Sequence, residues 1–228
     1  EGKYLIQDRT TGRVFESPQF LFMLVGVALF AKEDKSVRMS LVKKFYDTVS
    51  TFKVTLPSPV MNGVRTPTKQ FASCCLIEAG DSLDSINGVS NAVVNYISQR
   101  AGIGINSGAI RALGSPIRGG EAVHTGIIPF WKLFQAAVKS CSQGAMRGGA
   151  ATVFYPLWHL EVESLLVLKN NRGVEENRIR QMDYGVQINK LMYTRLLKGE
   201  EITLFSPSDV PGLYDAFFAD QDEFERLY

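Results

Sequence analysis

Stretches typical of β-strands alternate with stretches typical of α-helices along most of this 228-residue chain. Strands are expected over residues 71–78, 102–106, 152–155 and 184–188, and each is followed by a segment whose apolar residues fall on one helical face. Strand, helix and strand in this order form a parallel sheet covered by helices. The alternation therefore predicts an α/β fold with mainly parallel strand pairing.

The beginning of the chain follows a different pattern, which predicts a hairpin and a helical lead-in. The hairpin is expected over residues 3–16, and helices are expected over residues 18–31 and 36–49. A Ser-Pro pair supplies an N-cap and a first-turn proline for the first of these helices. We therefore divide the chain into an N-terminal hairpin and helical segment, residues 1–50, and an α/β region, residues 51–228.

Four local expectations complete the secondary structure. Residues 52–56 and 202–205 resemble short strands, and residues 107–122 resemble a long loop. Asp81 opens a helix, and the helical spacing places Leu83 on its buried face.

Composition excludes several classes of protein. Apolar residues make up 45% of the chain, which is typical of folded globular proteins, and the net charge of +2 gives no argument for nucleic acid. The longest apolar run, residues 20–30, is far shorter than the roughly 20 residues that cross a bilayer, so no membrane contact is expected. The chain opens Glu-Gly-Lys with no recognisable signal peptide, and three cysteines do not make a secreted disulfide framework. We expect a piece of a longer, cytoplasmic protein.

Glycine and positive charge gather in residues 101–150. This stretch holds ten of the twenty glycines, five basic residues and one acidic residue, a net charge of +4. Glycine lets backbone N–H groups approach an anion closely, and a guanidinium group binds phosphate through its planar fork. Two Arg-Gly-Gly sequences, at 118–120 and 147–149, flank one expected helix. Phosphate or nucleotide binding is the preferred interpretation, with structural turns and RNA binding as the alternatives.

The cysteines and histidines indicate no metal site. Cys74 and Cys75 are adjacent in an expected strand, so their side chains point to opposite faces, and no Cys-x-x-Cys sequence or His-rich set accompanies them. Cysteine is ordinarily a small buried apolar residue, although Cys74 also suits a redox thiol, for which Cys141 is the other candidate partner in the chain. His124 and His159 lack a nucleophile or Asp at motif spacing, which favours a core or helix-capping role.

Longer motifs occur in a fixed order through most of the chain. They include Ser50-Thr-Phe-Lys, Val64-Arg-Thr-Pro-Thr, Gly80-Asp-Ser-Leu-Asp-Ser-Ile, Ser98-Gln-Arg-Ala-Gly-Ile-Gly-Ile-Asn, Arg111-Ala-Leu-Gly-Ser-Pro-Ile-Arg-Gly-Gly, Lys139-Ser-Cys-Ser-Gln-Gly and Asp183-Tyr-Gly-Val-Gln-Ile-Asn-Lys. Together they resemble one family, the large catalytic subunit of aerobic ribonucleoside-diphosphate reductase, in its enterobacterial and phage type. The resemblance implies roughly the first half of a ten-stranded α/β barrel.

The resemblance also implies a reaction. The family reduces ribonucleoside diphosphates to deoxyribonucleoside diphosphates by radical chemistry, with a redox cysteine pair as reductant. Cys74 matches the first cysteine of that pair, whose partner would lie beyond residue 228. Ser58, Ser73 and Arg147 match positions that contact the substrate. Because the remaining catalytic parts would also lie outside residues 1–228, we expect this fragment alone to be inactive.

Regulation is the second implication of the resemblance. Asp81, Ser82, Leu83, Arg111 and Arg118 match the site at which a deoxynucleoside triphosphate effector selects the substrate. The loop with Gln143 and Arg147 matches the element that relays effector identity to the catalytic pocket.

The implied partners are the remainder of the catalytic subunit, a second copy of it, and a radical-generating small subunit that carries the family's metal and tyrosyl radical centre. Thioredoxin or glutaredoxin would return the cysteine pair to its thiol form, and ATP is a further effector. No cofactor and no metal are expected on this fragment. The alternative to an enzyme is a non-catalytic nucleotide-binding module derived from the same fold.

Overall fold

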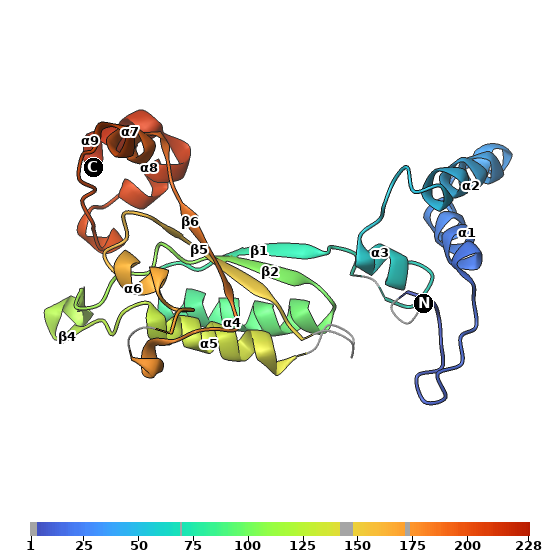
Figure 1. Ribbon diagram of the computed structural model, residues 1–228, viewed down its shortest axis with the longest axis horizontal. Coiled ribbons are helices and arrows are strands. Elements are labelled where there is room, and N and C mark those ends of the chain that lie inside the picture. The colour runs from blue at the N-terminus through green and yellow to red at the C-terminus, as the bar shows by residue number, and fades with distance from the viewer. Residues whose placement is uncertain (1–3, 69, 142–147, 172–173) are drawn as a thin grey trace. The chain divides into compact units, whose positions relative to one another are not determined.

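The computed structural model shows two units, which Figure 1 presents with their helices and strands labelled. Unit 1 comprises residues 1–74 and 99–101, and unit 2 comprises residues 75–98 and 102–228. The residues described are 4–68, 70–141, 148–171 and 174–228.

Four strands form the sheet of unit 2, in the spatial order β1, β2, β5, β6. Their bounds are Cys74–Glu78 for β1, Gly102–Asn106 for β2, Ala151–Pro156 for β5 and Asp183–Gln187 for β6. β2 pairs in parallel with β5, and β5 pairs in parallel with β6, so that Val153 lies between Ile105 and Tyr184. The α/β fold with parallel pairing is therefore confirmed.

Two amphipathic helices, α4 (Leu83–Ser98) and α5 (Ile128–Ser140), pack against each other and lie along the same face of the sheet (Figure 1). α4 begins where the Oγ of Ser82 accepts the N–H of Ser85 at 3.2 Å, which satisfies one of the free donors of the first turn. The apolar residues that the two helices bury against the sheet are Ile86, Val89, Val93, Ile97, Trp131, Phe134 and Val138. The sequence predicted these residues from their spacing.

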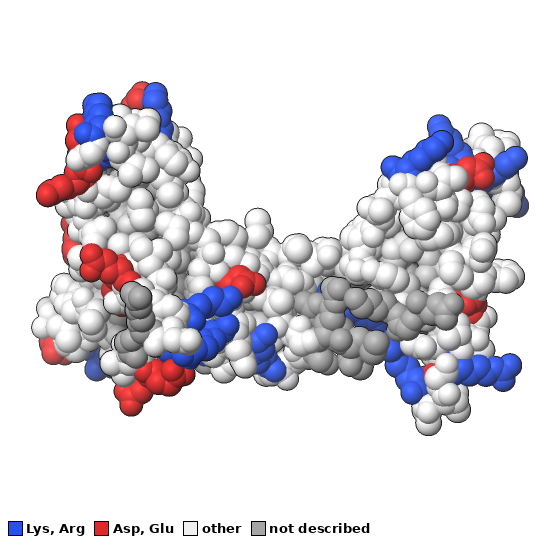
Figure 2. Space-filling model, in the orientation of Figure 1, with Lys and Arg blue, Asp and Glu red and all other residues white. Residues whose placement is uncertain are grey.

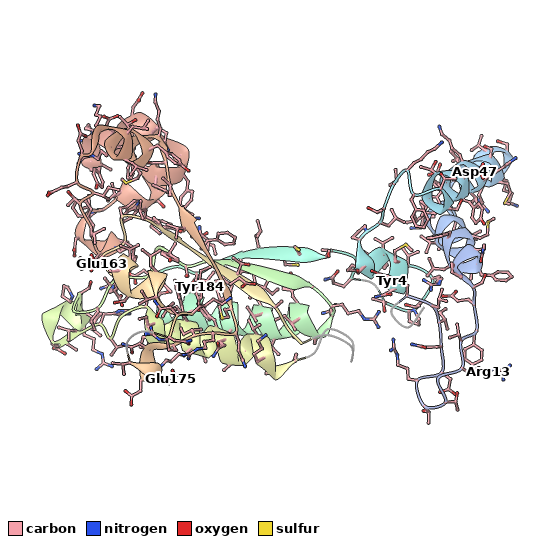
Figure 3. All side chains as sticks on the ribbon, in the orientation of Figure 1. Tyr4, Arg13, Asp47, Glu163, Glu175 and Tyr184 are labelled. Atoms are coloured by element: carbon pink, nitrogen blue, oxygen red, sulfur yellow. The ribbon has the colours of Figure 1, made fainter. Side chains whose placement is uncertain are left out.

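Trp131 links α5 to the sheet through the centre of this core. Its ring is fully buried and lies 5.6 Å from the ring of Tyr184, which Figure 3 labels, and 5.3 Å from that of Tyr155. The indole Nε1–H donates to the Oγ of Ser107 at 2.8 Å, so the buried polar atoms of both residues are paired. Burial raises the pKa of Tyr155 to about 12.

Between β2 and α5 the chain forms a small hairpin. Its strands are β3 (Pro116–Ile117) and β4 (Ala122–Val123), and a 3₁₀ turn, η1 (Arg118–Gly120), joins them. The expectation of a plain loop over residues 107–122 is therefore only partly correct.

After β5, unit 2 consists of β6 and a series of short helices and turns. These helices are α6 (Val162–Leu166), α7 (Lys190–Lys198), α8 (Leu213–Ala219) and α9 (Gln221–Leu227), with short 3₁₀ turns η2 (Glu175–Asn177) and η3 (Pro207–Asp209). Trp158, Met192, Leu213, Phe217 and Phe224 form a second apolar cluster here. The strand expected over residues 202–205 is wrong: Phe205 makes one isolated parallel bridge to His159.

Unit 1 contains α1 (Pro18–Leu29), α2 (Lys35–Ser50) and α3 (Ser58–Gly63), preceded by a turn that closes with an antiparallel bridge between Gln7 and Val14. The helical lead-in is confirmed, with Ser17 as the N-cap of α1. The strand expected over residues 52–56 is wrong, because Phe52 has φ +57°, which extended backbone does not allow, and the side chain is 78% exposed.

A buried ion pair between Arg65 and Glu16 fastens α3 to the N-terminal segment. The guanidinium group of Arg65 also donates to the carbonyl oxygen of Tyr4 at 2.8 Å, so both charges have several hydrogen-bond partners. Among the described residues, the helices are all too short or too polar to cross a membrane.

Candidate functional site

One pocket in unit 2 collects all five residues that the resemblance assigns to an effector site. Asp81, Ser82 and Leu83 enter it from the start of α4, Arg111 from the connection after β2, and Arg118 from the hairpin turn. The cavity has a volume of about 330 Å³. The sequence placed these residues in three separate segments, and the fold brings them together.

Asp81 and Arg111 form the polar wall of the pocket. The Asp81 carboxylate accepts the backbone N–H of Arg111 at 3.0 Å and its Nε–H at 2.8 Å, and a third contact joins Nη2 to the same carboxylate at 2.7 Å. Arg111 also donates to the carbonyl oxygen of Pro116 at 2.6 Å. The hydrogen bond to Asp81 raises the pKa of Arg111, so the positive charge is present at every physiological pH.

Arg118 extends from a turn with unusual backbone geometry. Arg118 has φ +52°, and Gly119 and Gly120 follow with φ +67° and φ +95°. Three consecutive left-handed residues need glycine at most positions, which explains the Arg-Gly-Gly sequence. The Arg118 side chain makes no ion pair with any described residue, so its guanidinium group is available to an anion.

His124 closes the pocket at the entry to α5. It is 9% exposed and stacks on the ring of Phe130, with 5.5 Å between ring centroids. Its Nδ1 accepts the N–H of Gly126 at 3.1 Å. Burial lowers the pKa of His124, which keeps the ring neutral at pH 7. The predicted core role is therefore observed, and the sequence did not identify the pocket as its location.

The remaining lining is largely apolar, and sequence reasoning missed it. These residues are Ile86, Ile117, Val123, Thr125 and Phe130. Leu83 belongs with them: it is 67% exposed, so its expected place on the buried face of α4 is wrong. Leu83 lines the pocket instead.

This arrangement suits an anionic ligand with an apolar part. The Arg118 guanidinium group and the N-terminus of a sixteen-residue helix favour negative charge in the pocket, while Arg111 is already paired with Asp81. Apolar side chains and the Phe130 ring, which also line the pocket, offer a surface for stacking. Among the described residues, no group of three or more His, Cys, Asp or Glu side chains has the arrangement of a metal site.

Three of the proposed substrate and redox residues, Ser58, Ser73 and Cys74, lie in unit 1. Ser58 begins α3 and its hydroxyl lies 3.2 Å from that of Tyr4, whereas Ser73 and Cys74 are exposed at the start of β1. None of the three cysteines forms a disulfide bond in the part of the chain that the structure describes, and Cys141 is the C-cap of α5. The described contacts do not join Ser58 to Ser73 or Cys74. Gln143 and Arg147 lie outside the described residues.

The sheet, the crossover helices and the anion-suited pocket define an α/β protein with a candidate site for a phosphorylated ligand. Comparison with models of known protein families identifies the family of the chain. The model of the ribonucleotide reductase barrel domain matches residues 72–228, and the model of the ribonucleotide reductase all-alpha domain matches residues 1–69. The chain therefore belongs to the ribonucleotide reductase family, and the resemblance seen in its motifs is confirmed.

Individual relatives agree with the family assignment. The chain is 76% identical to ribonucleoside-diphosphate reductase 1 subunit alpha of Escherichia coli and 72% identical to the alpha subunit of Haemophilus influenzae, in both cases over its entire length. It is 63% identical to the alpha subunit of Enterobacteria phage T4 over 99% of its length. In each case the chain spans 30% of the relative's length.

Proposed function

We propose that this chain acts as part of the alpha subunit of a ribonucleoside-diphosphate reductase and binds a deoxynucleoside triphosphate effector, or ATP, in the unit 2 pocket. The observation that carries the proposal is the meeting of Asp81, Ser82, Leu83, Arg111 and Arg118 around one cavity. The names of the relatives support the reaction class, which is the reduction of ribonucleoside diphosphates to deoxyribonucleoside diphosphates.

Each wall of the pocket has a role in this proposal. Arg118 and the N-terminus of α4 bind the triphosphate, because a flexible guanidinium group and free backbone donors both neutralise phosphate oxygens. Asp81 accepts the hydroxyl group of the sugar while Arg111 keeps its carboxylate in place. Phe130 and its apolar neighbours contact the base.

Cys74 has the redox role in the proposed reaction. With a second cysteine of the complete subunit it forms a disulfide, and the two electrons released reduce the ribose as its 2′-hydroxyl leaves as water. An exposed, free thiol supports this role, since exchange needs access to the sulfur. Ser58, Ser73 and Arg147 contact the substrate, and the loop with Gln143 and Arg147 relays effector identity.

The remaining parts of the proposal concern partners and organisation. The chain acts in the cytoplasm with the rest of its subunit, a second copy, a small subunit that supplies the radical, and thioredoxin or glutaredoxin as reductant. Residues 1–50 form the lead-in, and residues 51–228 belong to the barrel with its effector site.

Effector binding to an Arg118→Ala variant tests the central claim. Because Arg118 makes no ion pair within the described part of the chain, its loss should leave the fold intact and weaken thymidine triphosphate binding by roughly tenfold, the effect of one charge-assisted contact. Arg226→Ala removes an exposed arginine on α9 and serves as the control. Equal affinity of wild type and Arg118→Ala would refute the assignment of the pocket.

A further inference from the structure

One carboxylate outside the pocket connects two of its walls. Glu161 lies in the turn between β5 and α6, and its Oε2 accepts the backbone N–H of Leu113 at 2.9 Å and that of Ile127 at 3.0 Å. Leu113 follows Arg111 by two residues, and Ile127 follows His124 by three. A single oxygen atom therefore joins the segment that carries Arg111 to the segment that carries His124.

The other carboxylate oxygen is also closely enclosed. Gly126 has φ +90°, and a Cβ atom at this position would lie 2.7 Å from the Oε1 of Glu161. The absence of a side chain at Gly126 thus lets the carboxylate reach both backbone donors. A larger residue would displace Glu161 or the backbone before α5.

His159 fixes the position of Glu161 in turn. It is fully buried; its Nδ1 accepts the backbone N–H of Glu161 at 3.1 Å, and its Nε2–H donates to the carbonyl oxygen of Ile110 at 3.0 Å. Ser206 adds a neighbouring link, since its Oγ accepts the N–H of Ala112 at 3.0 Å. Both sides of Arg111 are therefore held by side chains from later in the chain.

We propose that Glu161 is a positioning residue of the effector pocket. By accepting two N–H groups on one oxygen, it holds the Arg111 and His124 segments together and so positions both walls of the pocket. It does so in addition to the backbone hydrogen bonds from Gly114 N–H to the His124 carbonyl oxygen (2.9 Å) and from His124 N–H to the Ser115 carbonyl oxygen (2.8 Å). The proposal rests on the proposed function for the identity of the ligand, a deoxynucleoside triphosphate. The claim that Glu161 positions the walls of the pocket does not depend on which ligand binds there.

Two measurements on the 228-residue chain test this role: amide hydrogen exchange at Leu113 and Ile127, and the affinity for thymidine triphosphate. Glu161→Ala should lose protection at both amides and bind thymidine triphosphate roughly tenfold more weakly, because two backbone donors lose their acceptor. Glu161→Gln retains an oxygen that can accept both N–H groups, and should keep the protection and bind within about threefold of wild type. Glu163→Ala, an exposed neighbour labelled in Figure 3, is the matched control and should match wild type.

The outcomes distinguish a positioning role of Glu161 from an effect of its charge and from a general loss of folding. Unchanged affinity and unchanged protection in Glu161→Ala would overturn the proposal, and so would an equal loss of affinity in Glu161→Gln, which would assign the effect to charge. If Glu161→Ala does not fold, Gly126→Ala should reproduce the loss of protection at Ile127 in a folded chain, and full protection there would overturn the proposal. Loss of protection in Glu161→Ala without any thymidine triphosphate binding by wild type would uphold the positioning role and refute the proposed effector.

Discussion

Mild acid should destabilise unit 2 through its two buried histidines. Burial lowers the pKa of His159 and of His124, and each ring uses Nδ1 to accept a backbone N–H group. A proton on Nδ1 would remove that acceptor and bring a charge into the core. The folded chain therefore binds these two protons less readily than the unfolded chain does.

The sign and size of the effect follow from proton linkage. Below about pH 6.5 the unfolded chain takes up a proton on each histidine more readily than the folded chain does, so the free energy of unfolding falls as the pH falls. For each histidine that stays neutral in the folded state, the free energy of unfolding falls by about 1.4 kcal/mol between pH 7.5 and pH 5.5. For a chain of this length, that loss lowers the melting temperature by roughly 3–6 °C per histidine.

Urea unfolding of wild type and His159→Gln at pH 7.5 and pH 5.5 measures this contribution. Glutamine can still donate an N–H to the carbonyl oxygen of Ile110, but it does not titrate. We expect the variant to be less stable at pH 7.5 and to lose up to about 1.4 kcal/mol less than wild type on acidification. The carboxylates are the same in both proteins and cancel in the comparison. An identical loss in wild type and variant would show that His159 does not stay neutral in the fold.

Two further predictions concern packing. Gly149→Ala should destabilise the chain by roughly 1–3 kcal/mol or more, because the new Cβ would lie 1.9 Å from the carbonyl oxygen of Val138 in α5. Gly148→Ala is the control, because a Cβ at that position meets open space. Equal melting temperatures for the two variants would contradict the packing argument. Trp131→Phe should lower the free energy of unfolding by roughly 1–3 kcal/mol, because it leaves the hydroxyl of the buried Ser107 without its donor. Urea unfolding monitored by circular dichroism measures this change. An unchanged unfolding midpoint would be inconsistent with that hydrogen bond.

The distribution of charged side chains bears on the choice between nucleotide binding and RNA binding. On the face shown in Figure 2, basic and acidic side chains lie beside one another over unit 2. Two of the five basic residues of 101–150, Arg111 and Arg118, line the pocket, and Arg111 is paired there with Asp81. A pocket with one guanidinium group uncompensated by the described residues suits a small anionic ligand better than the extended phosphate backbone of RNA.

Local sequence patterns predicted the elements that depend on periodicity. Apart from Leu83, the buried face of α4 appears as expected, and so do the parallel strands β2, β5 and β6, because burial on one side of an element leaves a repeat in the sequence. The pattern failed at residues 52–56, where apolar and β-branched residues have no partner strand and follow directly from the end of α2.

Motifs and periodicity predicted the fold class, the family and five residues of the pocket (Asp81, Ser82, Leu83, Arg111 and Arg118), because both are properties of neighbours along the chain. The sequence did not indicate that Asp81 already holds Arg111, that Leu83 and Phe130 share the pocket with Arg118, or that Glu161 joins two of its walls. The hydrogen bonds of Glu161 connect residues 34 and 48 positions apart, and such contacts leave no local repeat. These contacts form only in the folded chain, where the sheet and its helices bring distant backbone donors to one carboxylate.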